Sequence, residues 1–169
     1  CKSWSYDHIR SIEVDISAGE CVIQTSEDNK IRVEYSGDES QLKQNVEGES
    51  LHIGMDDVNF STVFSDEDRT IYLYLPQGFT FEDVELDVAA GTIFADQIMA
   101  EEISVGVGAG SCEISNLSAE READISVAGG DFSCYELYAG NASFECGMGA
   151  VNVSGKIGNV KVDCGVGSV

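Results

Sequence analysis

The chain has 169 residues, 43% of them hydrophobic and 24% charged, which is enough for one domain with a sizeable core and too few for two ordinary ones. Nine Lys and Arg stand against 31 Asp and Glu, so the net charge is −22. Such a surface repels phosphate backbones and anionic lipid headgroups, and we expect no nucleic-acid partner. No apolar run approaches the roughly 18–20 residues of a membrane-spanning helix.

The first half of the chain contains short segments in which apolar and polar residues alternate. The alternation is clear at residues 12–23, 31–35 and 71–75, and a period of two predicts strands with one buried face and one wet face. Two polar stretches lie between them, at 36–50 and 56–70. We interpret these stretches as acidic insertions or long loops, so that residues 1–80 form irregular N-terminal coils.

The second half, residues 81–169, repeats itself. Five glycines mark the repeats at spacings of 19, 20, 19 and 18 residues, namely Gly91, Gly110, Gly130, Gly149 and Gly167. Before each glycine, every second position is apolar or small. These inward slots are Val84, Leu86, Val88, Ala90; Ile103, Val105, Val107, Ala109; Ala123, Ile125, Val127, Gly129; Ala142, Phe144, Cys146, Met148; Val160, Val162, Cys164, Val166.

Strands that recur every 18–20 residues with the same slots filled are typical of a coiled path in which each turn stacks on the last. A hairpin sandwich would need tight-turn signals, and neither Asn-Gly nor Asp-Gly occurs. The sequence therefore predicts an all-β fold, a parallel β-helix or β-solenoid, right-handed by the usual crossover preference. No linker separates the halves, so residues 1–169 are read as a single domain.

The corners of the coil explain the glycines. A coil this short must turn within a few residues, and Gly reaches positive φ without a Cβ clash. The position two before each glycine is also small, being Ala89, Gly108, Ala128, Gly147 or Gly165. We expect this column to face outward at a crowded corner, in preference to a flat docking face.

Both ends of the sequence suggest expectations. The fifth repeat stops part-way round a coil at Val169, which predicts an open apolar cross-section and a C-terminal end truncated relative to the full coil. Cys1 opens the chain, and a processed bacterial lipoprotein also begins at a lipidated Cys. Lipidated Cys1 is therefore one candidate anchor.

Several motifs together resemble a known family. They are IEVDISAGECVI at 12–23, an LPQG step at 75–78, and tandem copies such as VELDVAAGTIFA and ISVGVGAGSCEI. On these motifs the chain resembles the bacterial putative-adhesin family over nearly its whole length. The resemblance implies an exported or membrane-tethered β-solenoid domain of unknown function, with no catalytic residues to carry over.

Six cysteines are present, at positions 1, 21, 112, 134, 146 and 164. No Cys-x-x-Cys occurs and there are two His, so a zinc site is not expected. Cys146 and Cys164 fill the same slot on successive coils, but parallel ladder neighbours keep their Cβ atoms about 4.8 Å apart, beyond the usual disulfide range of ~3.5–4.5 Å. We expect reduced thiols packed as small hydrophobes, with at least five free thiols in the denatured protein.

Catalytic groups are sparse. His8 and His52 both lie in the irregular half, so the repeats hold no Ser-His or Cys-His site, and no Gly-x-Ser-x-Gly elbow occurs. Paired carboxylates could cleave glycosides, but the repeats offer few cations and few aromatic residues for a sugar groove. We expect no enzyme and assign no catalytic, cofactor-binding or metal residues.

Calcium is the remaining possibility for acidic groups. Asp56 and Asp57, and residues 66–68, could gather oxygen ligands. No EF-hand loop is present, and charge runs are usually solvated, so we expect calcium to leave the melting temperature unchanged.

The sequence thus favours a non-catalytic, extracytoplasmic or cell-surface module, an adhesin or envelope scaffold whose ligand is an unidentified surface protein or glycan. One alternative is a carbohydrate-active enzyme on a β-helix, which a groove with two acids ~5–10 Å apart and aromatic flanks would favour. Another is a self-assembly module that joins end to end through the open C-terminal coil.

Overall fold

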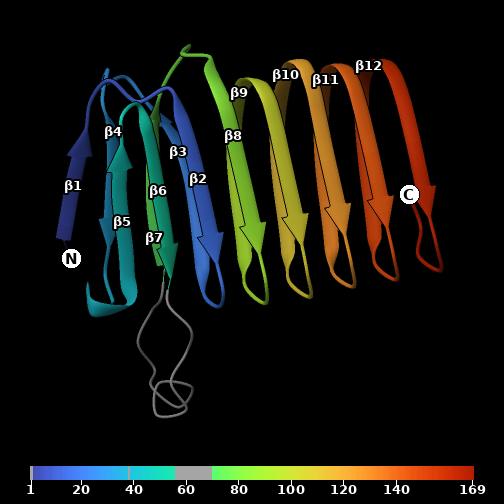
Figure 1. The fold of residues 1–169 in the computed structure, drawn as a ribbon, viewed down its shortest axis with the longest axis horizontal. Helices are drawn as coiled ribbons and strands as arrows, with labels where there is room; N and C mark the ends of the chain where they lie inside the picture. Colours follow the sequence, from blue (N-terminus) through green and yellow to red (C-terminus); the bar gives the residue numbers. More distant parts are fainter. Residues whose placement is uncertain (1, 38, 56–69) are drawn as a thin grey trace.

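The protein is all-β in the computed structural model, which describes residues 2–37, 39–55 and 70–169 (Figure 1). Over these ranges the one helical element is the 3-10 turn Glu39–Gln41, and no helix is long and apolar enough to cross a membrane. The strands are β1 (Lys2–Tyr6), β2 (Ser11–Ile16), β3 (Glu20–Ser26), β4 (Ile31–Tyr35), β5 (Leu42–Glu47), β6 (Ser50–Met55), β7 (Thr70–Pro76), β8 (Phe81–Val88), β9 (Thr92–Val107), β10 (Ser111–Val127), β11 (Asp131–Cys146) and β12 (Ala150–Cys164).

These strands form one mixed sheet that folds back on itself. The start of β9 pairs with β3 and its end pairs with β8, so a single long strand runs through two faces. We call the part of each turn that corresponds to residues 92–99 the first leg, and the part that corresponds to residues 102–107 the second leg. The turns stand side by side along the long axis of the molecule, with β1 near one end and β12 at the other (Figure 1).

Successive turns are parallel and in register across the repeats. Thr92 pairs with Ser111, which pairs with Asp131, and Val107 likewise pairs with Val127, which pairs with Cys146. The pattern continues from β11 to β12, where Cys146 pairs with Cys164. The prediction that each Gly-marked segment lies directly over its predecessor is confirmed.

The hydrophobic core fills the space between the two legs. The first three predicted slots are buried in the first four repeats, and so are Ile12, Val14, Ile16, Cys21 and Ile23. The fourth slot, occupied by Ala90, Ala109, Gly129 and Met148, is exposed, so that part of the prediction is wrong. The strands end before this position, at Val88 and Val127 for example, and the chain has already turned outward.

The irregular N-terminal part departs from a purely parallel coil. β4 is antiparallel to both β1 and β7, and β5 is antiparallel to β6. β2, β6 and β8 nevertheless pair in parallel, as do β3 and β7, so the coil pattern persists in the centre of this region. The expectation that residues 1–80 consist of coils with insertions is therefore only partly correct.

The polar stretch at 36–50 is not a simple loop. It contains the strand β5, which turns back into β6 through the two residues Gly48 and Glu49. Gly48 has φ 61°, the conformation that a two-residue hairpin needs at its first central position. A hairpin thus forms without Asn-Gly or Asp-Gly. Most of the second polar stretch, with Asp56, Asp57 and residues 66–68, lies outside the described residues.

The corner glycines are required for a different reason from the one expected. None of the five has a positive φ. A Cβ added at Gly110, Gly130 or Gly149 would instead overlap the carbonyl oxygen of the preceding corner glycine. The outward column two places earlier is crowded as predicted, since a Cβ at Gly147 would lie 2.9 Å from the Ala128 carbonyl oxygen.

The cysteines of the inward slots are free thiols. Cys21, Cys112, Cys134 and Cys146 are buried, and Cys164 is exposed on the last strand. Burial raises the pKa of Cys21 to about 12 and that of Cys134 to about 11. All five thiols are free, as predicted, and the four buried ones pack as small hydrophobes; for the exposed Cys164 the predicted packing is wrong.

Gly130 offers a direct test of the stacked corners. We expect Gly130→Ala to lower the free energy of unfolding by about 2–3 kcal/mol, because its Cβ meets a backbone oxygen that cannot move without disturbing the ladder. Gly129→Ala is the matched control, since its Cβ would find no atom closer than 3.7 Å. Urea denaturation of both variants makes the measurement, and equal losses in the two would contradict the steric account.

Thiol reactivity provides a second test. In the native protein at pH 8, we expect Cys164 to react with a disulfide reagent far faster than Cys21 or Cys112, because only exposed thiolates react. Mass mapping of the labelled cysteines over time gives the order. Rapid labelling of Cys21 would show that the core is open at the first turn.

Candidate functional site

The outer face of the second leg is strongly acidic. Its outward positions form columns across β2, β8, β9, β10, β11 and β12, because register pairing sets equivalent residues side by side. We call this surface the acidic face; its carboxylates are Glu13, Asp15, Asp83, Glu85, Asp87, Glu102, Glu122, Asp124, Glu145 and Asp163. The sequence indicated an acidic surface but not that the acids would share one face.

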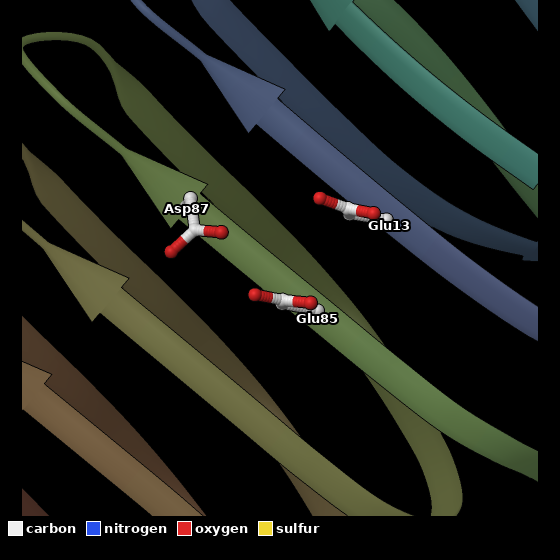
Figure 2. A group of neighbouring side chains, drawn as sticks. All are labelled: Glu13, Glu85 and Asp87. Carbon is white, nitrogen blue, oxygen red and sulfur yellow. The ribbon is translucent and has the colours of Figure 1, made fainter.

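Three carboxylates of this face come together near its start (Figure 2). Oxygen atoms of Glu13 on β2 and of Glu85 and Asp87 on β8 lie within 4.8 Å of one another. Such a group could hold a hard cation through oxygen ligands, although exposed acids commonly gather without one. The calcium-binding candidates predicted from the sequence are other residues, at 56–57 and 66–68.

Among these three carboxyl groups, Asp87 has a clearly raised pKa. Partial burial raises its pKa to about 6, and repulsion from Glu85 and Asp15 adds to the shift. The Asp87 carboxylate also lies against the neighbouring strand β9, where a Cβ added at Gly106 would lie 2.6 Å from the Asp87 Oδ1 atom. The side chain is thus held between two acids and a glycine.

A polar groove of about 400 Å³ lies beside the cluster. Glu13, Glu85 and His52 line it, and the Nδ1 atom of His52 lies 3.5 Å from Glu13 Oε2. Phe, Tyr and Trp are absent from the described lining residues. The carboxylate oxygens of the cluster lie within 4.8 Å of one another, closer than the ~5–10 Å that would favour a glycosidase, and the described lining of the groove lacks aromatic flanks.

Aromatic side chains gather instead in a hollow of about 330 Å³, which we call the aromatic hollow. Connections between strands build it, since its lining comes from the segments after β1, β3, β5 and β7. The lining residues are Tyr6, Asp7, His8, Ile9, Arg10, Asn29, Ile31, Glu49, Pro76, Phe79 and Phe81.

The floor and walls of the aromatic hollow are apolar. Ile9, Ile31 and Phe81 are buried beneath it, whereas Phe79 is 41% exposed and packs edge-on against Phe81 at 4.8 Å between ring centroids. Gly78, with φ 77°, makes the turn that presents Phe79. A concave apolar floor with a few polar groups is the usual form of a ligand site.

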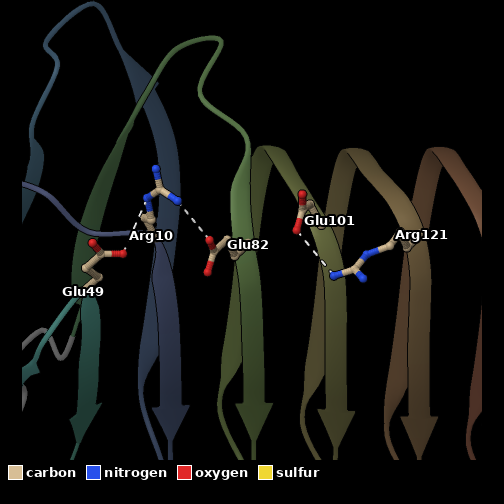
Figure 3. Close-up of polar contacts among 5 residues, drawn as sticks. All are labelled: Arg10, Glu49, Glu82, Glu101 and Arg121. Atoms are coloured by element: carbon tan, nitrogen blue, oxygen red, sulfur yellow. Dashed lines mark hydrogen bonds and ion pairs between the residues drawn. The ribbon is translucent and has the colours of Figure 1, made fainter.

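Polar groups ring the aromatic hollow. His8 has φ 56°, a rare value for a residue other than Gly, and its backbone N–H donates to Asp7 Oδ1 at 2.9 Å. Arg10 lies between Glu49 and Glu82, with N–O distances of 3.5 and 3.0 Å (Figure 3). The rim thus offers donors and acceptors of both charges.

A second arginine, Arg121, forms ion pairs between two successive turns of the repeats. Arg121 contacts Glu101 of the previous turn at 3.4 Å (Figure 3). It also contacts the neighbouring Glu102 at 3.4 Å. These exposed pairs contribute at most about 1 kcal/mol each. Their effect is to offset repulsion at the border of the acidic face.

The structure brings together residues that the sequence did not single out as a site. Tyr6, Asn29 and Phe79 are far apart in the chain, and none of them belongs to the repeats. His8 and His52 lie apart, one at the aromatic hollow and the other at the polar groove. The one available signal was the LPQG step, whose Gly78 turn delivers Phe79.

Comparisons with known proteins agree on the fold. The model of the family described as Toastrack DUF4097 matches residues 9–167. No curated protein matches the chain. A putative cell adhesion protein from Clostridium sporogenes has a similar structure, with a TM-score of 0.60 at 16% identity, covering 99% of this chain and 96% of that one.

Two further solved structures are more distant. A putative adhesin from Bacteroides fragilis has a TM-score of 0.45 at 13% identity, and one from Parabacteroides distasonis has 0.40 at 16%. Each covers 99% of this chain and 94% of its own. At these identities the likeness extends to the fold alone, and of these three structures the Clostridium one, with a TM-score above 0.5, supports it.

The raised pKa of Asp87 leads to a test of the acidic cluster. A carboxyl whose pKa is raised in the folded state weakens folding as pH rises from about 4 through 6, because the folded state must give up a proton that it binds more tightly. We expect Asp87→Asn to raise the free energy of unfolding at pH 7 by about 1 kcal/mol, allowing for partial solvent screening, and to have no such effect at pH 4.

Asp124→Asn is the control for this test. It removes the same charge from the same face, but its ladder neighbours are Ser104 and Ser143. Urea denaturation at the two pH values measures both variants. A gain for Asp87→Asn that is equal at pH 4 and pH 7 would contradict the electrostatic origin.

Proposed function

Because the chain belongs to the Toastrack DUF4097 family, we propose that it is a non-catalytic β-solenoid module of the extracytoplasmic cell surface, an adhesin or envelope scaffold that binds a glycan through the aromatic hollow. The parallel, in-register turns support the description as a solenoid. Ladders of this kind make a stiff body that can display a binding site.

The observation that carries the glycan assignment is the composition of the aromatic hollow. Tyr6 and Phe79 provide ring faces or edges, and Asp7, Asn29 and Arg10 provide hydrogen-bonding groups at the rim. Tyr side chains combine an apolar body with a polar tip and so suit partly wet ligands. A neutral glycan meets both requirements, whereas anionic ligands face the net charge of −22.

The description of the Clostridium protein as a cell adhesion protein is consistent with this proposal. The non-catalytic part is supported by the separation of features on this chain. The close carboxylates lie in the polar groove, while the aromatic residues lie in a different hollow. A glycosidase needs acids and substrate contacts at one place.

Binding of the purified protein to a glycan array and to immobilised mucin tests the proposal. We expect Phe79→Ala to weaken binding at least tenfold, because it removes the exposed ring of the hollow. Phe94→Ala is the matched control, since Phe94 is 40% exposed but lies on the outer face of the first leg. Equal effects of the two substitutions, or no binding of the unaltered protein to any glycan, would overturn the glycan assignment.

The same experiment tests the absence of catalysis. The oligosaccharides that the protein binds on the array are incubated with it in solution for a prolonged time, and their masses are then measured by mass spectrometry. We expect them intact, and shortened products that disappear with Glu13→Gln would replace the proposal with a hydrolase.

A further inference from the structure

Arg10 lies at the rim of the aromatic hollow between two carboxylates. Its backbone N–H donates to the Glu49 carbonyl oxygen at 2.7 Å, and its own carbonyl oxygen accepts from the Glu82 N–H at 2.8 Å. The side chains repeat this arrangement, since Arg10 Nε lies 3.5 Å from Glu49 Oε2 and Arg10 Nη1 donates to Glu82 Oε1 at 3.0 Å. The pairing of β2 with β6 and β8 thus sets one acid on each side of the guanidinium.

The two acids leave part of this guanidinium for a ligand. Their contacts use Nε and Nη1, and Figure 3 shows the other terminal nitrogen directed away from both carboxylates. A guanidinium has more N–H donors than these two contacts occupy. Because Arg10 lines the aromatic hollow, the remaining donors lie at the site that we propose for the glycan.

The charge of this rim is negative although an arginine belongs to it. Asp7 and Glu49 line the aromatic hollow together with Arg10, and Glu82 contacts Arg10 from outside the lining. The carboxylates therefore outnumber the guanidinium of Arg10. An anionic ligand meets net repulsion there, whereas a hydroxyl or amide carbonyl oxygen can still accept a hydrogen bond.

We propose that Glu82 makes the aromatic hollow selective for uncharged sugars, because it cancels the charge of Arg10 and leaves the guanidinium as a hydrogen-bond donor. The preferred ligands are neutral hexoses and acetamido sugars, whose hydroxyl and carbonyl oxygens accept such a bond, and uronic acids are excluded. Arg10 contacts the sugar, and Glu82 acts through it as a positioning residue. This inference rests on the glycan assignment proposed above.

Glu82→Gln removes the charge with little change of shape. The amide oxygen of the new side chain can still accept from Arg10, and the backbone bond between the two residues remains. The Glu82 side chain is 54% exposed, so the loss of its ion pair costs little stability, which thermal unfolding checks. Glu49→Gln, on the other side of Arg10, is a second variant that should act in the same direction.

The measurement uses an array of glycan pairs, in which one member ends in a neutral hexose and the other in the corresponding uronic acid. We expect the unaltered protein to prefer the neutral members. Glu82→Gln should raise the affinity for the acidic members about threefold, the effect of one unit charge at close range in water, and leave the neutral members unchanged. The gain should disappear in about 1 M salt, where the screening length is about 3 Å.

Glu101→Gln is the matched control. Glu101 holds the position on β9 that Glu82 holds on β8, because the next residues, Asp83 and Glu102, pair with each other. It removes the same charge from the same row of residues but lies outside the lining of the hollow, so we expect no gain (Figure 3). On the Glu82→Gln background, Arg10→Gln should abolish the gain, because the attracting guanidinium is gone.

Three results would overturn the inference and leave the glycan assignment standing. The first is an unaltered protein that binds acidic and neutral members equally. The second is a Glu82→Gln variant whose gain is absent or is matched by Glu101→Gln, which would indicate the general field of the acidic surface. The third is a gain that persists after Arg10→Gln. If the unaltered protein binds no glycan at all, the glycan assignment itself is wrong, and this inference falls with it.

Discussion

The fold depends on how closely successive turns approach at their corners. There, the carbonyl oxygen of one corner glycine occupies the space in which a Cβ of the next would stand. The amide of Asp131 donates to the Gly110 carbonyl at 3.1 Å, and the equivalent bond recurs from Ala150 to Gly130 at 3.0 Å. This contact fixes where each turn begins, and with it the register of both legs. Every later property of the surface follows from that register.

The parallel part of the fold was predictable because two local signals agreed. Period-two alternation specified the strands, and the glycine spacing of 18–20 residues specified their stacking. The N-terminal part lacked the second signal. Whether β7 inserts between β3 and β4 depends on pairings between residues about 40 positions apart, such as Arg32 with Tyr74, which no local pattern encodes. Even the corner glycines were identified correctly for a wrong reason, since they avoid a clash and do not adopt positive φ.

The candidate site was less predictable than the fold. The repeat pattern could have placed Glu13 beside Glu85, because each stands the same number of residues before its corner glycine and the two strands pair in register. The aromatic hollow could not be found in this way. Its lining belongs to connections, and the spatial meeting of Tyr6, Asn29 and Phe79 follows from the antiparallel strands that the sequence did not reveal.

The register also explains how an acidic face is tolerated. A column repeats at about 4.8 Å, so like charges on neighbouring strands repel strongly unless smaller residues separate them. In two of the columns across β9 to β11 such spacing exists, since Ser104, Gly106 and Ser126 interrupt them, whereas in the third column Glu102 lies directly beside Glu122. Between β2 and β8 the columns are not interrupted, and repulsion from Glu85 and Asp15 adds to the burial that raises the pKa of Asp87. At the border between the irregular part and the repeats, burial and repulsion thus act on the same carboxyl group.

This division gives the two halves different physical tasks. The irregular part and the first turn of the repeats together contain the aromatic hollow, the polar groove and the acid cluster, so this end carries the chemical variety of the molecule. The repeats add length at about 4.8 Å per turn while keeping the same inner slots and corner contacts. A substitution in an outer column of the repeats changes the charge of one face without altering the core, whereas one in a connection of the irregular part alters a hollow. Recognition is therefore best sought in the connections of the irregular part.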